Sequence, residues 1–110
     1  MAADDAGADR DTVSVGPVLS SGRIADAIVA AIRDQHPDVM VTDRGSYLRV
    51  LVPGRCRVTG AAISAALGSP FRLPGDLERV MPSFSGRFQV SAVEASWSAA
   101  GAPPGAAVPL

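Results

Sequence analysis

The side chains in this chain that could do chemistry are few, and each stands alone. The sequence holds a single histidine, His36, and a single cysteine, Cys56. Nucleophilic catalysis needs a base beside the attacking serine or cysteine. His36 precedes Pro37 at a predicted helix end, where we expect a capping or solvent-exposed role. Cys56 falls in a predicted strand, where a small buried side chain is expected. The sequence therefore gives no support for a nucleophilic enzyme.

Metal and phosphate sites have no better support. Glu78 and Glu94 are the only glutamates, and the sequence has no Glu-x-x-His or His-x-His spacing, so neither an iron nor a zinc site is expected. A P-loop needs a lysine, whereas all ten basic residues are arginines. The net charge of −1 favours neither nucleic acid nor an acidic membrane as a partner. We predict a protein that is not an enzyme, binds no cofactor or metal, and acts by contact.

The length and composition indicate one domain with two tails. A chain of 110 residues with 47% hydrophobic residues can build a single core. No apolar run approaches the roughly 18–20 residues of a membrane span, and the acidic start lacks the pattern of a secretory signal, which favours the cytoplasm. Residues 1–12, with four aspartates against Arg10, are expected to form a mobile arm. Residues 99–110, rich in Ala, Pro and Gly, are expected to form a disordered tail, leaving 13–98 as the folded body.

The first half of this body predicts a strand, a helix and three strands. Residues 15–19 suit a short strand, and Ser20 or Ser21 could cap a helix that ends near Gln35. Its apolar stripe, at helical spacing, is Ile24, Ala27, Ile28, Ala31 and Ile32. Strands are predicted at 39–42, 47–52 and 55–58. In the second of them, Leu48, Val50 and Val52 share one face, and Tyr47, Arg49 and Leu51 share the other.

The second half predicts a helix, an irregular segment and a hairpin. Thr59 should cap a helix to Leu67 that Gly68 stops, with Ala62, Ile63, Ala66 and Leu67 facing inward. Residues 69–85 read as irregular, anchored by Phe71, Leu73, Leu77, Val80, Met81 and Phe84. Residues 86–90 and 94–98 predict a hairpin with Arg87, Gln89, Glu94 and Ser96 on its polar face and Phe88 paired with Trp97. The fold class is α+β: a compact single domain with antiparallel β-hairpins packed on two helices.

Five blocks carry a resemblance to a known family. They are Val15-Gly16-Pro17-Val18-Leu19, Asp43-Arg44-Gly45-Ser46-Tyr47, Pro53-Gly54-Arg55-Cys56, Leu67-Gly68-Ser69-Pro70-Phe71 and Ser83-Phe84-Ser85-Gly86-Arg87. Together they resemble the small effector (coupling) proteins of soluble diiron monooxygenases, the regulatory components of methane, phenol, toluene and alkene monooxygenases. The resemblance spans about Val13 to Trp97. The sequence departs from the family's pattern at Gly60, at Ser91-Ala92-Val93 and in the Pro/Ala tail.

The resemblance implies a function, a partner and a set of contact residues. Such effectors bind no cofactor; they dock on the hydroxylase component, tune access of substrate and oxygen, and couple NADH oxidation to hydroxylation or epoxidation. The hydroxylase would be the direct partner and the reductase an indirect one, with no nucleic acid and no membrane involved. The matched turns make the following residues candidates for the hydroxylase interface: Arg44, Ser46, Tyr47, Ser83, Phe84, Ser85 and Arg87.

A second function stays open beside this one. A stand-alone α+β module that binds a small apolar ligand, or a peptide at an exposed strand edge, would have a similar composition. The hydrocarbon substrate is not encoded here, because selectivity in such systems resides mainly in the hydroxylase cavity.

Overall fold

The computed structural model describes residues 13–99. The strands are β1 (Ser14–Ser20), β2 (Met40–Asp43), β3 (Tyr47–Pro53), β4 (Arg55–Thr59), β5 (Ser83–Ser85), β6 (Arg87–Val90) and β7 (Glu94–Ser98). The helices are α2 (Arg23–Gln35), α3 (Gly60–Leu67) and α4 (Gly75–Val80). The α+β class is therefore confirmed, with α4 as a helix that the sequence did not predict. None of the helices in this range combines the length and apolar character that a membrane span needs.

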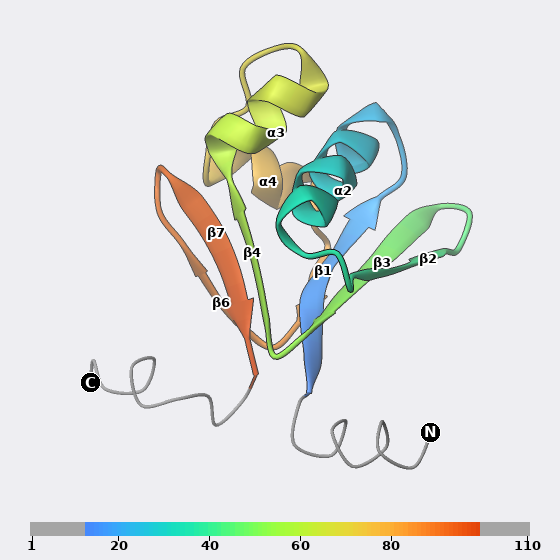
Figure 1. The fold of residues 1–110 in the computed structure, drawn as a ribbon. Coiled ribbons are helices and arrows are strands. Elements are labelled where there is room, and N and C mark those ends of the chain that lie inside the picture. The colour runs from blue at the N-terminus through green and yellow to red at the C-terminus, as the bar shows by residue number, and fades with distance from the viewer. Residues whose placement is uncertain (1–12, 100–110) are drawn as a thin grey trace.

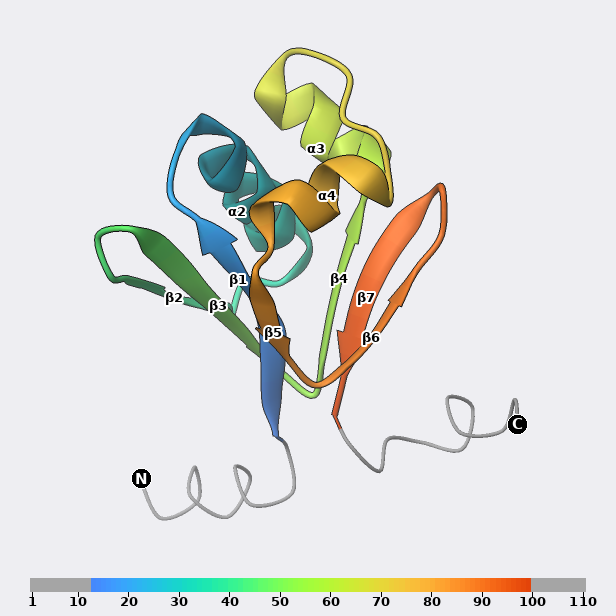
Figure 2. The same cartoon turned by 180° about the vertical axis from the view of Figure 1, so that it is seen from behind.

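Two antiparallel sheets meet at one end and diverge toward the other, with the helices between them at the open end (Figures 1 and 2). The first sheet has the order β2-β3-β1-β5 and the second the order β4-β7-β6. The chain passes directly from one sheet to the other at two corners, Gly54 between β3 and β4, and Gly86 between β5 and β6, and it returns from β4 to β5 through α3 and α4. Both glycines have positive φ, 77° and 99°, which a residue with a Cβ adopts only with strain. These glycines allow sharp corners between the sheets.

The core lies where the inner faces of both sheets meet the helices. Along β3 the burial alternates, so that Leu48, Val50 and Val52 point inward as predicted. In the second sheet Cys56 and Val58 of β4 face inward beside Trp97 of β7. The largest fully buried side chains are Trp97, Leu19, Ile28, Ile32, Ile63 and Leu77.

Helix α2 confirms the predicted amphipathic helix but differs at its start. Ile28 and Ile32 are fully buried, whereas Ile24 is 36% exposed because it lies in the first turn, at the rim of the core. The predicted serine cap is wrong: the N-cap is Gly22, with no side-chain cap hydrogen bond. At the other end the His36 backbone N–H donates to the Ile32 carbonyl, and the helix ends before Pro37 as expected.

Helix α3 begins and ends as the sequence predicts. The Thr59 hydroxyl accepts a hydrogen bond from the Ala62 N–H at 3.1 Å, and Gly68 closes the helix in the left-handed region at φ 80°. Ile63 is fully buried, but Ala66 is exposed, so its predicted inward position is wrong. In an eight-residue helix only one side packs on the core, and Ala66 lies off that side.

Residues 69–85 are more regular than predicted. They contain α4 and the edge strand β5. The Asp76 carboxylate accepts from the Arg72 N–H at 2.8 Å, and the Ser64 hydroxyl accepts from the Phe71 N–H at 2.9 Å, which ties the segment to α3. Five of the six predicted anchors are buried or half-buried (Phe71, Leu73, Leu77, Val80 and Met81). Phe84 is 43% exposed instead, because β5 is an edge strand.

The final hairpin, β6 and β7, is confirmed, including the pairing of Phe88 with Trp97. Ser96, predicted on the polar face, is buried because β7 is the central strand of its sheet and is flanked by β4 and β6. The predicted arm, residues 1–12, and the predicted tail beyond Ala99 lie outside the described residues.

Candidate docking surfaces

His36 and Cys56, the two residues considered for catalysis, both have structural roles. The His36 ring Nε2 lies 3.0 Å from the Arg57 backbone N–H, so this imidazole links the end of α2 to β4. The Cys56 thiol is fully buried, and desolvation raises its pKa to about 12. A thiol held neutral in this way is a poor nucleophile. Within residues 13–99, no three His, Cys, Asp or Glu side chains cluster as metal ligands.

The turn between β2 and β3 presents three candidate contact residues to solvent. The Asp43 carboxylate accepts from the Gly45 N–H at 2.8 Å, and the Arg44 N–H donates to the Tyr47 carbonyl at 2.8 Å. Gly45 has a φ of 87°, which explains the glycine at this tip. Arg44, Ser46 and Tyr47 are all exposed on this internally bonded turn.

The segment from Ser83 to Arg87 holds the other four candidates. Ser83, Phe84 and Arg87 are exposed, and Ser85 is half-buried. The Phe84 ring lies 5.2 Å from that of Phe88, which in turn lies 5.3 Å from the Trp97 ring. Distances of this size are typical of favourable aromatic pairs. The aromatic row therefore runs from the buried Trp97 through the half-buried Phe88 to the exposed Phe84, which packs on it.

Strand register divides the seven candidates between two faces. Tyr47 pairs with Ser20 of β1, and Ser83 pairs with Val18 of the same strand. Tyr47, Ser83 and Ser85 therefore share the outer face of the four-stranded sheet, with Arg44 and Ser46 at its hairpin tip. Phe84 points to the other side of β5, because successive residues of a strand alternate. Arg87 begins β6 and so belongs to the other sheet.

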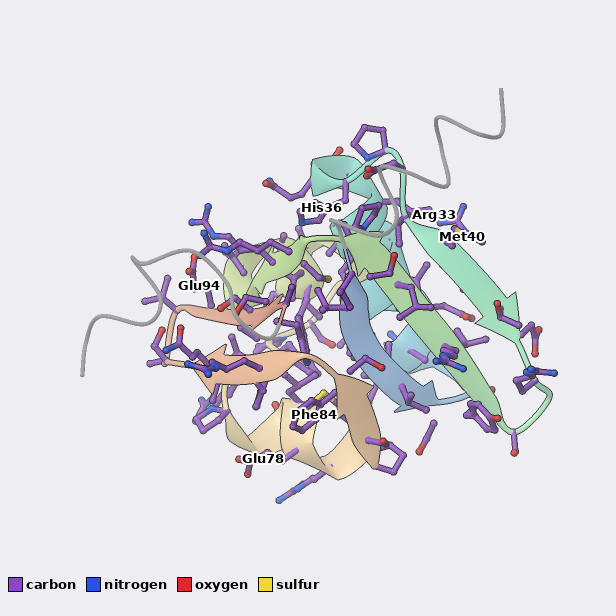
Figure 3. The ribbon with its side chains drawn as sticks, turned by 90° about the horizontal axis from the view of Figure 1, so that it is seen from below. Arg33, His36, Met40, Glu78, Phe84 and Glu94 are labelled. Carbon is purple, nitrogen blue, oxygen red and sulfur yellow. The ribbon has the colours of Figure 1, made fainter. Side chains whose placement is uncertain are left out.

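This outer face also carries exposed and half-buried residues outside the seven predicted contact residues. Met40 is 67% exposed and pairs with Leu51, while Val18 pairs with the exposed Arg49. We call this surface the β2-β3-β1-β5 face: Val18, Met40, Tyr47, Arg49, Leu51, Ser83 and Ser85, with Arg44 and Ser46 at the tip. The alternation along β3 predicts from the sequence that Arg49 and Leu51 share a face with Tyr47. Val18 and Met40 can be assigned to this face only from the strand pairing in the structure. From below, Met40 and Phe84 lie on well-separated parts of the molecule (Figure 3).

The outer face of the three-stranded sheet is rich in arginine. Arg55 and Arg57 of β4 and Arg87 of β6 alternate with inward-facing neighbours and are exposed. Arg57 forms an ion pair with Glu94 of β7, Nη2 to Oε1 at 2.7 Å. The hydrogen bond from Arg57 lowers the pKa of Glu94 below its usual value. We call these three arginines the arginine face.

Two shallow hollows lie on the helical side. One of about 220 Å³ lies between α2 and α3, and one of about 270 Å³ lies between α2, α4 and the loop that follows α3. Both are lined by Arg23 and Leu67, whose carbonyl accepts a hydrogen bond from the Arg23 guanidinium at 3.2 Å. They are small for a ligand site, because pockets for small molecules are typically about 300–1,000 Å³.

The fold and these surfaces define an α+β protein whose described part presents two exposed sheet faces and two small hollows. Residues 13–98 match the model of the MmoB/DmpM family. The chain is 41% identical over 91 residues to the effector subunit of the alkene monooxygenase system of Xanthobacter autotrophicus, covering 81% of this chain and 89% of that protein. The chain therefore belongs to the MmoB/DmpM family, and the resemblance drawn from the sequence is confirmed.

Two solved structures share the fold. One is from a phenol hydroxylase–regulatory protein complex, with a TM-score of 0.68 and 12% identity over 77% of this chain and 95% of that one. The other is the regulatory protein B of soluble methane monooxygenase, with a TM-score of 0.60 and 24% identity over 82% of this chain and 66% of that one. At these identities the likeness concerns the fold.

Proposed function

We propose that this chain is the non-catalytic effector subunit of a multicomponent diiron monooxygenase and that it acts by docking on the hydroxylase component. The observation that carries the proposal is the 41% identity to an alkene monooxygenase effector subunit over most of both chains. A structure with the same fold comes from a complex named for phenol hydroxylase and its regulatory protein. The cytoplasm is the proposed location, since a further structural relative belongs to a soluble monooxygenase.

Docking would act on the hydroxylase by shifting its conformational population. An effector that binds one hydroxylase conformation more tightly than another favours that conformation, and the shift is limited by the difference in binding free energy. Moving a state from 1% to 99% requires about 5.5 kcal/mol of differential binding. In this proposal the shift tunes access of substrate and oxygen to the diiron centre and couples NADH oxidation to hydroxylation or epoxidation. The reductase is affected only indirectly.

The β2-β3-β1-β5 face is the proposed docking surface. Met40 and Leu51 pair at one end of the face, and Val18 lies on the neighbouring strand opposite Arg49. Arg49 stands between Leu51 and Tyr47 along β3, Tyr47 is 38% exposed, and the hairpin tip supplies a polar rim. Apolar, aromatic and arginine side chains together are the usual composition of a protein interface. Phe84 could extend the contact around the β5 edge.

Reconstitution tests the function. Purified effector is added to the cognate hydroxylase and reductase, and product formed per NADH consumed is measured. The proposal expects this ratio to rise with added effector and to saturate at a defined stoichiometry. A ratio that stays flat while the hydroxylase is active would overturn it.

Matched substitutions test the surface. We expect Arg44→Ala and Tyr47→Ala each to weaken hydroxylase binding by about tenfold or more, because truncating an interface anchor costs roughly 1.4 kcal/mol or more. Both side chains are exposed, so the melting temperature should stay nearly unchanged. Arg33→Ala, an exposed arginine on the polar side of α2, is the control and should bind like the parent. Weakening by Arg33→Ala alone would move the docking surface to the first helix.

A further inference from the structure

Strand β2 forms one edge of the four-stranded sheet, and its side away from β3 is unpaired. The order β2-β3-β1-β5 gives β2 a single neighbour, and it lies at the outside of the molecule (Figures 1 and 2). The Arg44 N–H donates to the Tyr47 carbonyl, so Arg44 and every second residue before it direct their backbone groups toward β3. Val41 and Asp43 therefore direct their backbone groups outward, where no strand within residues 13–99 pairs with them. An open edge of this kind is a template for another strand.

The two ends of β2 carry opposite charge. Asp38 comes two residues before the strand, Arg44 directly follows it, and both side chains are exposed. Within the described residues neither of them forms an ion pair. Both lie three residues from Val41, one on each side. When two copies of this strand lie antiparallel about a two-fold axis at Val41, Arg44 of each copy meets Asp38 of the other, so the edge is complementary to itself.

The other sheet edges lack this combination. At the edge of β4, the Arg57 N–H already donates to the His36 ring at 3.0 Å. β5 has only three residues, which leaves little backbone to pair. β6 begins with Arg87 and is followed by Ser91 and Ala92, so its two ends offer no charge pair. Among the described edges, β2 is therefore the one that suits an identical strand.

We propose that two copies of this chain associate through their β2 strands, antiparallel and centred on Val41. In this register the Val41 N–H of each copy donates to the Val41 carbonyl of the other, and each Asp43 N–H faces the Val39 carbonyl of the other copy. Arg44 of each copy pairs with Asp38 of the other. The two four-stranded sheets become one continuous sheet, with the β2-β3-β1-β5 faces of both copies on the same side.

The association is weak and reversible. The seam covers Met40, whose side chain is 67% exposed in the single chain, because it lies beside Thr42 of the second copy. Each copy contributes only one strand of four residues, however, and interfaces below about 1,200 Å² are typical of transient contacts. Exposed ion pairs each add little and are screened by salt. The dimer should therefore form only at high protein concentration, from about 0.1 to 1 mM.

Sedimentation equilibrium and amide exchange test this association in the full-length protein. The weight-average mass should rise from that of one chain toward twice that value as the concentration is raised. Over the same range the amides of Val41 and Asp43 should become protected from exchange, whereas the Thr42 amide, which faces β3, should show no change. A chain that stays monomeric at the highest concentration would overturn the proposal. So would new protection confined to Phe88 and Val90, because the contact would then involve β6.

Charge reversal on separate chains gives the sharper test. Asp38→Arg brings two arginines together at each end of the seam, and Arg44→Asp brings two aspartates together, so each variant alone should self-associate about tenfold more weakly or less. An equimolar mixture of the two variants restores both opposite-charge pairs and should associate like the parent. Arg87→Asp, the same change on the other sheet, is the matched control and should also associate like the parent.

The mixture keeps the test decisive. All three substituted side chains are exposed, so the variants should melt like the parent, and a folding defect in either partner would appear in the melt. Association that the mixture fails to recover, with both variants folded, would contradict the Val41-centred register. The hydroxylase takes no part in these measurements, so their outcome is independent of the proposed function.

Discussion

Two glycines with positive φ, Gly45 and Gly86, should respond very differently to the same substitution. Gly45 has a φ of 87° and open space where a Cβ would lie. Gly86 has a φ of 99°, but a Cβ there would lie 2.6 Å from the Val15 Cγ1 and 2.7 Å from the Ser98 carbonyl oxygen. Alanine at either position incurs backbone strain, whereas alanine at Gly86 must also push two packed groups apart.

The magnitudes follow from these two contributions. A left-handed backbone costs a residue with a Cβ roughly 1–2 kcal/mol, which is the whole expected loss for Gly45→Ala. Overpacking a well-filled site adds about 1–3 kcal/mol, so Gly86→Ala should lose about 2–5 kcal/mol of unfolding free energy. The difference between the variants isolates the steric contribution at the corner between β5 and β6.

Urea unfolding measures both losses. Trp97 is the only tryptophan and is fully buried, so its fluorescence follows the exposure of the core. The slope of unfolding free energy against urea should match the parent in both variants, with only the midpoint moving. Equal midpoints, or a larger loss at Gly45, would refute the reasoning, since the corner would then accommodate a methyl group freely.

Three further predictions concern the core and the second sheet. Ile28→Ala should cost about 2–5 kcal/mol in denaturant melts, and Ile24→Ala should cost less than about 1 kcal/mol because its side chain is already partly exposed. The Cys56 thiol should react with a thiol reagent at pH 8 only as fast as the protein unfolds. Its raised folded pKa of about 12 means that the unfolded chain loses this proton first, so stability should fall as pH rises above about 8.5, and Cys56→Ala should flatten that slope. The pKa of Glu94 is lowered by its pairing with Arg57, so this pair stabilises the fold at pH values above the unfolded pKa of about 4.3. The stabilisation should disappear as pH falls below that value, and Glu94→Gln should lack this pH-dependent contribution.

Local chemistry made much of the fold predictable from the sequence. The Thr59 cap, the Gly68 stop and the alternation in β3 depend on neighbours a few residues away, and the structure confirms each. Helix α4 could not be predicted in this way, because six residues give too little helical period. Its start depends instead on Asp76, whose carboxylate and N–H both bond to Arg72.

The surfaces were less predictable, because they depend on strand order. β7 lies between β4 and β6, which buries Ser96 and sets Arg55 opposite Ser98. β4 and β7 are about forty residues apart in sequence, and no local pattern specifies that pairing. For the same reason the sequence could not show that the candidate contact residues lie on two sheets. Arg87 follows Ser85 closely in sequence but belongs to the other sheet.

Gly54 bonds to both ends of the described chain: its N–H donates to the Val13 carbonyl, and its carbonyl accepts from the Ala99 N–H at 3.1 Å. The folded body is therefore nearly a closed ring. A short linker could join residue 99 to residue 13, and new ends could be opened in an exposed turn such as Ser91–Val93, the kind of place where circular permutation succeeds. A fluorophore or a tether attached at residue 13 or at residue 99 would leave the folded body from nearly the same point, so the two attachment sites would present the docking surfaces in similar ways.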